Sequence, residues 1–296
     1  MKYLDRFELV DEDFNPDFVR KIKNSYTEDE WFPTGFFSKK SLRRIDFEAV
    51  TVFYGGNGSG KSTLLNLIAE KLDLQRSTNV SVTKSFYDYV DMCKERKSKI
   101  PSGSKMLASE DVFQNIFSAR STNMKIDEKR AEDEEFFDYA ALDSQFDEFA
   151  AEGMVSKRLV KKQYMAKKSP RRERQYSNGE NALRFFKQEI QKKKLYLLDE
   201  PENSMSPAFQ LELKDFLEDC AKFNGCQFII ATHSPFILGM EDAIIYNLDD
   251  TPVSVDKWYN LKNMRVYYEF FSQYKDLFEL FQDTVLYKKG GGVRKK

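Results

Sequence analysis

Gly55-Gly56-Asn57-Gly58-Ser59-Gly60-Lys61-Ser62 is the stretch that decides the fold of this sequence. It matches the pattern G-x-x-x-x-G-K-[ST], a loop whose backbone N–H groups surround the phosphates of a nucleotide. The pattern is diagnostic when it lies between a strand and a helix. Val50 to Tyr54 is β-branched and aromatic, as strands are, and Ser62 to Leu72 has leucine and isoleucine at helical spacing. The sequence therefore predicts a strand, a phosphate-binding loop and a helix, rather than an ordinary glycine turn.

The residue types in this loop predict how it would hold ATP and Mg²⁺. Glycine permits the backbone angles and the close approach that a phosphate cradle requires. We expect Lys61 to reach the β- and γ-phosphates and the Ser62 hydroxyl to bind Mg²⁺, at the positive end of the following helix. The predicted nucleotide-binding residues are Gly55, Gly56, Asn57, Gly58, Ser59, Gly60, Lys61, Ser62 and Thr63.

A second set of polar residues follows two other short apolar runs. Leu195 to Leu198 is typical of a buried parallel strand, and it ends in Asp199 and Glu200. Because adjacent strand residues point to opposite sides, we expect Asp199 to bind Mg²⁺ and Glu200 to polarise an attacking water. His233, the single histidine, follows the apolar run Phe228 to Thr232. At the end of a parallel strand its imidazole is expected beside the γ-phosphate and the water.

Four motifs, in this order, resemble those of the ABC-type ATPase family, which includes transporter nucleotide-binding subunits, SMC proteins and DNA-repair ATPases. They are Gly55 to Ser62, Tyr176-Ser177-Asn178-Gly179-Glu180, Leu195 to Glu200, and Ala231-Thr232-His233-Ser234. The second is similar to the family's L-S-G-G-Q signature. The resemblance implies that two copies sandwich two ATP molecules, and that each nucleotide is contacted by the other copy's Ser177, Asn178, Gly179 and Glu180. A helix N-cap alone would also explain Ser177.

The sequence departs from the family's pattern at several positions. Asn178 replaces a signature glycine, and Glu180 replaces the glutamine, as in the SMC branch. Transporter subunits usually have S-A-L-D where this chain has Pro201-Glu202-Asn203-Ser204-Met205-Ser206. This segment, paired with Thr232-His233-Ser234-Pro235, is closer to soluble ATPases of bacterial chromosomes and defence systems. Two assignments stay open: Gln114 or Ser109-Glu110-Asp111 for the family's lone glutamine, and Trp31, Phe32, Phe36 or Phe37 for the adenine-stacking aromatic residue.

The predicted fold is α/β, a P-loop NTPase of ABC type with a mostly parallel central sheet flanked by helices. Further strands are expected at Ile45 to Phe47 and Lys105 to Ala108, and a helix from Pro207 to Lys222. Residues 126–174 are expected to form an inserted, charged helical lobe between core segments 1–125 and 175–296. In this lobe an acidic run, Asp127 to Glu152, precedes a basic run, Lys157 to Arg174. A core-facing helical stripe is predicted near the C-terminus, from Phe270, Tyr274, Leu277, Phe278 and Phe281.

The composition narrows the class of protein. The 296 residues carry a net charge of -1, so no overall basic field draws the chain to nucleic acid or anionic lipid. Three cysteines without a CxxC pair indicate neither a disulfide framework nor a zinc site. No run approaches the ~18 apolar residues that span a bilayer, and the N-terminus lacks the features of a signal peptide. We therefore expect a cytoplasmic protein that is not itself a channel or a permease.

The leading hypothesis is a stand-alone, soluble ABC-type ATPase in which ATP closes a head-to-tail homodimer and hydrolysis reopens it. The cycle would act on nucleic acid or on an effector protein, for example in DNA repair or anti-phage defence. The basic run Lys157 to Arg174 is the candidate contact for nucleic acid. Two alternatives are kept: a nucleotide-binding subunit of an ABC transporter, and an ATP-dependent switch with negligible turnover.

Overall fold

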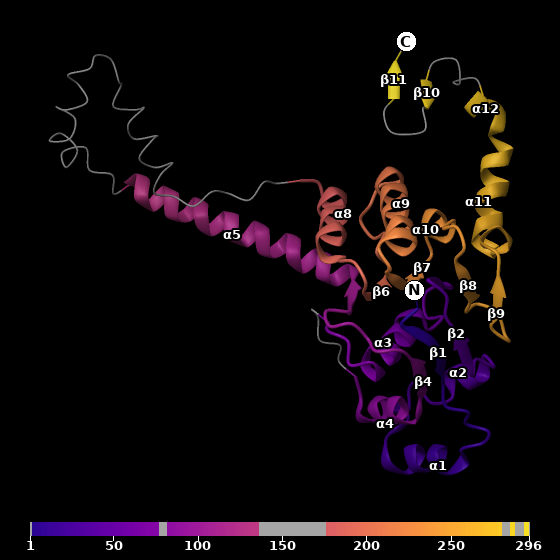
Figure 1. The fold of residues 1–296 in the computed structure, drawn as a ribbon. Helices are drawn as coiled ribbons and strands as arrows, with labels where there is room; N and C mark the ends of the chain where they lie inside the picture. Colours follow the sequence, from indigo (N-terminus) through magenta and orange to yellow (C-terminus); the bar gives the residue numbers. More distant parts are fainter. Residues whose placement is uncertain (1, 77–81, 136–175, 280–284, 288–292, 296) are drawn as a thin grey trace, which may run out of the picture. The chain divides into compact units, whose positions relative to one another are not determined.

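The computed structural model describes residues 2–76, 82–135, 176–279, 285–287 and 293–295. The chain forms two compact units, Met1–Ala108 with Ile190–Lys296, and Ser109–Glu189. The first unit contains the sheets, and the described part of the second unit consists of two helices, α5 and α8 (Figure 1). The predicted phosphate-binding loop belongs to the first unit, and the predicted signature segment belongs to the second.

The first unit is built around a six-stranded sheet with the order β5-β6-β7-β3-β8-β9. Its first five strands run parallel, and β9 is antiparallel to β8. In the register, Val52 of β3 lies opposite Ile230 of β7 and Ile245 of β8. The strands are β5 (Lys105–Ala108), β6 (Leu195–Asp199), β7 (Gln227–Thr232), β3 (Val50–Tyr54), β8 (Ile244–Asn247) and β9 (Ser254–Asp256). Because the strands are parallel, β3, β6 and β7 all end at one edge of the sheet.

Helices cover the central strands, which explains their continuous apolar sequence. Every residue of β3 and β7 is buried, a pattern typical of parallel strands that are packed on both faces. Helix α3 (Lys61–Lys71) packs against β5, β6 and β7, and α9 (Pro207–Phe223) packs against β7. Figure 1 shows α3 and α9 on opposite sides of these strands. The predicted mostly parallel sheet flanked by helices is therefore confirmed.

A smaller antiparallel sheet, with the order β2-β1-β4, is joined to the central sheet through a buried glutamine. Its strands are β2 (Arg44–Asp46), β1 (Leu4–Glu8) and β4 (Lys94–Lys97). The side chain of Gln227, in β7, accepts hydrogen bonds from the backbone N–H groups of Tyr3 and Leu4 at 2.7 and 2.9 Å. It also donates to the Leu4 carbonyl at 2.8 Å. The glutamine side chain thus replaces backbone pairing between the two sheets.

Short helices surround this smaller sheet and connect it to the phosphate-binding loop. They are α1 (Pro16–Ser25), the 3₁₀ helix η1 (Glu28–Glu30), α2 (Phe36–Lys39) and α4 (Lys84–Met92). Phe18 of α1 contacts Tyr89 of α4 edge to face, with ring centroids 6.2 Å apart. Tyr89 is completely buried, so this contact belongs to the main hydrophobic core.

The second unit consists, in its described part, of the long helix α5 (Ser109–Glu135) and of α8 (Asn178–Glu189), which pack together. The predicted inserted lobe, residues 126–174, begins inside α5, because residues 126–135 continue that helix. The remainder of the lobe, including the whole basic run Lys157 to Arg174, lies outside the described residues. The lobe and its boundaries therefore stay predictions.

The C-terminal part of the first unit contradicts one prediction. It contains α10 (Pro235–Leu238), η2 (Trp258–Asn260), α11 (Lys262–Gln273), α12 (Lys275–Glu279) and the hairpin of β10 (Val285–Tyr287) and β11 (Val293–Lys295). Phe270 is 53% exposed and Phe278 57% exposed, and Tyr274 and Leu277 are exposed as well. The prediction of a core-facing stripe is therefore wrong for these four residues, and Phe281 lies outside the described residues. The helical periodicity is present, but only Leu261 and Met264 at the start of α11 pack into the core.

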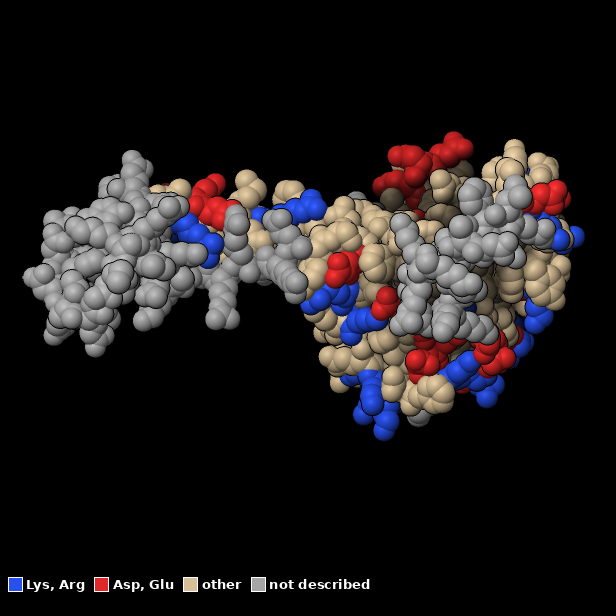
Figure 2. Space-filling view, turned by 90° about the horizontal axis from the view of Figure 1, so that it is seen from above, with Lys and Arg blue, Asp and Glu red and all other residues tan. Residues whose placement is uncertain are grey.

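None of the helices in the described ranges is both long enough and apolar enough to cross a membrane. On the face seen in Figure 2, acidic and basic side chains form separate small groups among a larger area of uncharged residues. This mixture agrees with the net charge of -1.

Candidate functional site

The loop Gly55 to Ser62 joins the buried end of β3 to the start of α3. Gly58 and Gly60 have φ angles of +76° and +102°, which residues with a Cβ rarely adopt. A Cβ at Gly60 would lie 2.6 Å from the Phe36 ring, so this position also has no room for a side chain. The loop therefore depends on its glycines for both backbone conformation and space.

Lys61 is the first residue of α3, and its side chain is almost completely buried. The ammonium donates hydrogen bonds to the Gly55 and Gly56 carbonyls of its own loop, at 2.8 and 3.2 Å. Its Nζ also lies 3.7 Å from Glu200 Oε1. A buried ammonium requires such partners, because leaving a charge unpaired in the interior is costly. The predicted phosphate-binding cation thus lies inside the loop, beside the predicted catalytic carboxylate.

Ser62 and Asp199, the two predicted Mg²⁺ ligands, are in contact. The Ser62 hydroxyl donates to Asp199 Oδ1 at 3.1 Å, although the residues are far apart in the sequence. The described residues contain no group of three or more His, Cys, Asp or Glu side chains that could hold a metal by themselves. Mg²⁺ at phosphate sites is usually held by one or two protein oxygens together with phosphates and waters, so this pair fits the ion.

Glu200 follows β6 and has an unusual backbone conformation. Its φ angle is +46°, in the left-handed region that non-glycine residues rarely occupy. The conformation is held by the hydrogen bond from Glu200 N–H to the Ala231 carbonyl at 2.9 Å. Asn203 donates to Glu200 Oε2 at 3.1 Å. Backbone strain of this kind persists where the surroundings hold it and is frequent at active sites.

His233 lies beside two glutamates at the end of β7. Its Nδ1 is 3.7 Å from Glu200 Oε1 and 3.8 Å from Glu202 Oε1, and the side chain is 48% exposed. Glu202 is buried and accepts hydrogen bonds from the Thr232 hydroxyl at 2.5 Å and from the N–H groups of His233 and Ser234 at 3.2 Å each. Burial raises the pKa of the Glu202 carboxyl above its ordinary value. Glu202 therefore links the segment after β6 to the segment that carries His233.

The structure brings together Lys61, Ser62, Asp199, Glu200 and His233, all predicted from the sequence. It adds Glu202, which is recognisable in the sequence only as part of a departure from the transporter pattern. It also adds Asp249, whose carboxylate accepts from Gly56 N–H at 2.9 and 3.1 Å. Asp249 closely follows β8, and a polar residue after an apolar run is the sequence signal that could have indicated it.

The aromatic residues left open by the sequence occupy different environments. Phe37 is completely buried, and Trp31 donates its indole N–H to the Tyr26 carbonyl at 3.0 Å. Phe36 lies against Gly60, and its ring contacts the half-exposed Phe32 edge to face, with centroids 5.4 Å apart. Of the four candidates, Phe32 and Phe36 are therefore the accessible aromatic pair beside the loop.

The predicted signature segment lies at the start of α8, in the second unit. The Ser177 hydroxyl accepts from Glu180 N–H at 3.2 Å, so it caps the helix. Ser177 and Asn178 are exposed, whereas Gly179 is buried, and Arg120 of α5 donates to Asn178 Oδ1 at 2.8 Å. Gln114, one candidate for the family's lone glutamine, and Ser109-Glu110-Asp111, the other, all lie in α5. The cap that would explain Ser177 structurally is therefore present.

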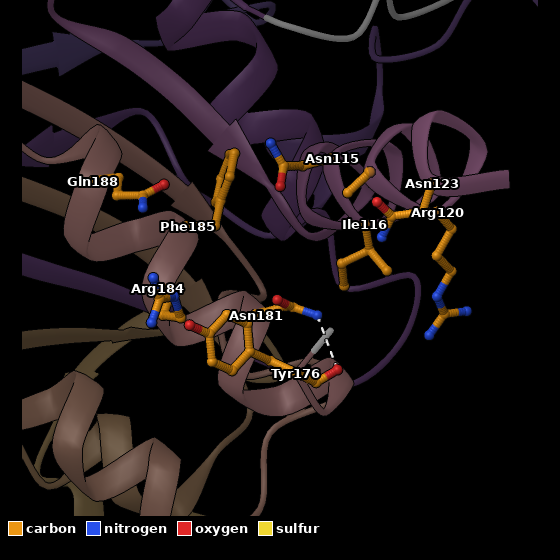
Figure 3. Close-up of a pocket in the computed structure, with 10 residues that line it drawn as sticks. Asn115, Ile116, Arg120, Asn123, Tyr176, Asn181, Arg184, Phe185 and Gln188 are labelled. Atoms are coloured by element: carbon orange, nitrogen blue, oxygen red, sulfur yellow. Dashed lines mark hydrogen bonds between the residues drawn. The ribbon is translucent and has the colours of Figure 1, made fainter. Parts of the chain in front are cut away.

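A polar cavity of about 310 Å³ lies between α5 and α8, next to this segment (Figure 3). Arg184 lies over the Tyr176 ring, with its guanidinium carbon 4.2 Å from the centroid. Asn181 donates to the Tyr176 carbonyl at 3.2 Å, shown as the dashed line in Figure 3. These contacts fix the chain just before the signature serine.

Two family models and several known proteins match this chain. The family model described as "AAA domain, putative AbiEii toxin, Type IV TA system" matches residues 186–239. The chain is 23% identical over 206 residues to the thiamine import ATP-binding protein ThiQ of Brucella abortus, covering 69% of this chain and 76% of that protein. It is 27% identical over 189 residues to ThiQ of Chelativorans, covering 63% of this chain and 67% of that protein.

The Smc head domain of Pyrococcus furiosus, solved with an extended coiled coil and bound to the C-terminal domain of ScpA, aligns at a TM-score of 0.40. That alignment has 16% identity and covers 91% of this chain and all of the other. The family model described as "ABC transporter" matches residues 44–203, a range that contains the phosphate-binding loop, the signature segment and both carboxylates after β6. Because this range is more than half of the 296 residues, the chain belongs to the ABC ATPase family that the model describes.

Proposed function

We propose that this protein is a Mg²⁺-dependent ATPase in which bound ATP closes a homodimer and hydrolysis reopens it. The observation that carries the proposal is the cluster of Lys61, Ser62, Asp199, Glu200 and His233 at one edge of the parallel sheet. Lys61 and Ser62 come from the loop, Asp199 and Glu200 from the end of β6, and His233 from the end of β7, and catalytic groups in open α/β sheets lie at such strand ends. Membership of the ABC ATPase family supports ATP as the nucleotide.

Each residue has a distinct role in the proposed reaction. Lys61 would exchange the carbonyls of Gly55 and Gly56 for the β- and γ-phosphates. Ser62 and Asp199 would hold Mg²⁺, whose charge would stabilise the negative phosphates. Glu200 is the general base for the attacking water, and its strained backbone fixes the direction of the carboxylate. His233 donates a hydrogen bond to the γ-phosphate. Phe32 and Phe36 are the surface on which adenine stacks.

The second copy would complete the site through its signature segment. Ser177 caps helix α8 and Gly179 lies in its first turn, and the first N–H groups of a helix bind phosphate oxygens. Both the hydroxyl of Ser177 and the positive end of α8 are suited to the γ-phosphate of the partner's ATP. The SMC-like Glu180 replaces the family's glutamine in this contact.

Replacing Glu200 with glutamine tests the proposal. Glutamine cannot accept the proton of the water, so kcat should fall by at least roughly 100-fold while ATP binding persists. The variant should then accumulate as an ATP-bound dimer. Phosphate release and sedimentation with Mg²⁺ and ATP measure the two effects, and Glu212→Gln on the exposed surface of α9 is the control. Normal turnover in the Glu200→Gln variant would remove Glu200 from its role, and negligible turnover in the wild type would favour a switch over an enzyme.

A nucleotide-binding subunit of a transporter is the second candidate, and the similarity to thiamine import ATP-binding proteins favours it. The segment Pro201-Glu202-Asn203-Ser204 argues for the first candidate, because transporter subunits usually have S-A-L-D there. A transporter subunit would co-purify with an integral membrane protein from its native host. Under the first proposal the ATPase works in the cytoplasm on nucleic acid or on an effector protein, and the AbiEii-type match is compatible with an effector.

Nucleic acid is tested separately through the basic run Lys157 to Arg174. Clustered cations displace counterions from phosphates, so binding through this run should weaken steeply as salt rises. Reversing the charge of Lys161, Lys162, Lys167 and Lys168 should abolish such binding. Binding to DNA or RNA that is unaffected by salt or by these substitutions would exclude this run as the contact.

A further inference from the structure

Helices α11 and α12 carry an aromatic face that is exposed to solvent. They are nearly continuous, because Leu277 N–H bonds to the Tyr274 carbonyl at 3.0 Å across the single residue between them. The rings of Phe270 and Phe271 are in contact, with centroids 5.4 Å apart, and Phe270 also contacts Tyr274 at 5.2 Å. Phe271 contacts Phe278 at 5.9 Å. The rings therefore form one continuous patch rather than isolated exposed residues.

The size of this patch matches one half of a stable protein interface. The exposed fractions of its side chains range from 44% for Tyr274 to 67% for Tyr268. An aromatic side chain offers about 150–250 Å² and an aliphatic one less, so the five aromatic residues and Leu277 on this face, with the neighbouring Val266 and Tyr268, leave about 800 Å² of mainly apolar surface in water. Stable interfaces bury about 800 Å² per partner, whereas the largest patch on an ordinary monomer is about 300–600 Å². The members are Tyr267, Phe270, Phe271, Tyr274, Leu277 and Phe278, flanked by Val266 and Tyr268.

Between Tyr267 and Tyr274 the order of residues on this face is symmetric about the pair Phe270 and Phe271, whereas Leu277 and Phe278 lie beyond the symmetric stretch. The pattern is Y-x-x-F-F-x-x-Y from Tyr267 to Tyr274, which is the same in both directions along the chain. Two copies that pack antiparallel about a two-fold axis would place Phe270 against the partner's Phe271 and Tyr267 against the partner's Tyr274. In a two-fold contact the same patch of both copies meets, so the patch must be complementary to itself. The symmetric order of residues meets this requirement, because each aromatic residue then lies against an aromatic residue of the partner. Arg265, Glu269 and Asp276 lie on the opposite side of the helix, so like charges do not meet.

We propose that this face is a nucleotide-independent dimer contact, occupied by α11 and α12 of a second copy of the chain. The position of α11 connects the contact to the phosphate-binding loop. Asn263, in its first turn, donates its N–H to the hydroxyl of Tyr54 at 3.3 Å, and Tyr54 directly precedes Gly55. A permanent contact holds two ATP sites in one assembly and raises their effective concentration for each other. This dimer is separate from the ATP-driven closure proposed above and does not depend on it.

Sedimentation of the full chain without nucleotide tests the contact. The wild type should have a mass of about twice 34.8 kDa at micromolar concentration. Phe270→Glu with Phe271→Glu places four carboxylates at the two-fold axis and should weaken the dimer by at least about 100-fold. Phe223→Glu is the matched control, because Phe223 is an exposed phenylalanine on α9, outside the patch. Far-UV circular dichroism spectra at 25 °C should coincide for all three proteins, which shows that each variant is folded.

The same experiment separates this contact from the ATP-driven one. The Lys61→Ala variant should lose closure on ATP and should keep the nucleotide-free dimer. A wild type that is monomeric without nucleotide, or a Phe270→Glu, Phe271→Glu variant that stays dimeric, overturns the inference and leaves the proposed ATPase unaffected.

Disulfide trapping tests the antiparallel arrangement. Chains with Tyr267→Cys mixed with chains with Tyr274→Cys should cross-link to each other, because these positions face one another across the axis. Tyr267→Cys alone should not cross-link, since seven residues of helix separate the two copies of this position by about 10 Å. The native cysteines Cys93, Cys220 and Cys226 are buried, so they do not compete. Efficient cross-linking of Tyr267→Cys alone contradicts the antiparallel pairing.

Discussion

Two glutamates at the candidate site have different roles because they differ in burial. Glu202 is separated from Glu200 by one proline, yet Glu202 is buried and Glu200 is partly exposed. The hydrogen bonds from Thr232, His233 and Ser234 give Glu202 a structural role, since they hold the backbone that carries the imidazole. Glu200 Oε1 lies 3.7 Å from both Lys61 Nζ and His233 Nδ1, which is the position from which it would act on water in the proposed reaction.

The buried Glu202 should have a specific effect on stability as pH changes. Burial raises its pKa in the folded protein above the ordinary value of 4.5, so the folded state keeps this proton to higher pH than the unfolded chain. The contribution of Glu202 to stability is therefore complete below pH 4.5 and is lost as pH rises through the folded pKa. The difference in unfolding free energy, wild type minus Glu202→Gln, should fall as pH rises above 4.5 and through the folded pKa. Urea titrations at several pH values measure it.

Glu241 is the control for this prediction, because its pKa is shifted in the opposite direction. Its hydrogen bond with Lys222 lowers the pKa of this exposed carboxyl. The pH dependence is therefore opposite to that of Glu202. Glu241 contributes to the free energy of unfolding above its ordinary pKa, and this contribution is lost on acidification. If the loss of stability caused by Glu202→Gln instead becomes larger as pH rises, as expected for Glu241→Gln, then Glu202 is ionised as readily as a surface carboxylate.

Among the secondary-structure elements, the two sheets are joined by a buried glutamine in addition to the apolar core that they share. Gln227 is completely buried, and its amide satisfies backbone groups of Tyr3, Leu4 and Glu48. These groups lie near β1, whereas the glutamine belongs to β7. The smaller sheet is thereby fixed to the sheet that carries the phosphate-binding loop.

Replacing Gln227 with leucine should destabilise the protein by about 2–4 kcal/mol, because two buried N–H donors and two carbonyls would lose their partner. Chemical denaturation monitored by fluorescence measures the change. Gln191→Leu, at an exposed position just before β6, should change the free energy of unfolding by less than about 0.5 kcal/mol. Equal effects of the two substitutions would show that the Gln227 hydrogen bonds contribute little to joining the sheets.

For the whole molecule, nucleotide binding and folding should be coupled. A ligand that binds only the folded chain at about 100 times its Kd adds about 2.7 kcal/mol to stability. For a chain of 296 residues, that corresponds to a rise in Tm of roughly 4 °C. A non-hydrolysable ATP analogue with Mg²⁺ should produce this rise in the wild type and not in Lys61→Ala. Differential scanning fluorimetry measures it, and an equal rise in both proteins would place the bound nucleotide outside the loop.

The sequence by itself determined the phosphate-binding loop, the buried parallel strands and the residues Asp199, Glu200 and His233, because each follows from a local pattern of a few adjacent residues. Local patterns could not predict that Glu202 would be buried, that Asp249 would bind Gly56, or that Phe36 rather than Phe37 would be accessible beside Gly60. These outcomes depend on which strands become neighbours in the sheet, and β3 pairs with β7 and β8 across long separations in the chain. The aromatic helix α11 shows the same limit, since its periodicity indicates an apolar face but not what covers that face. Only the tertiary structure decides burial, because burial is a property of the surfaces that meet and not of the segment that carries them.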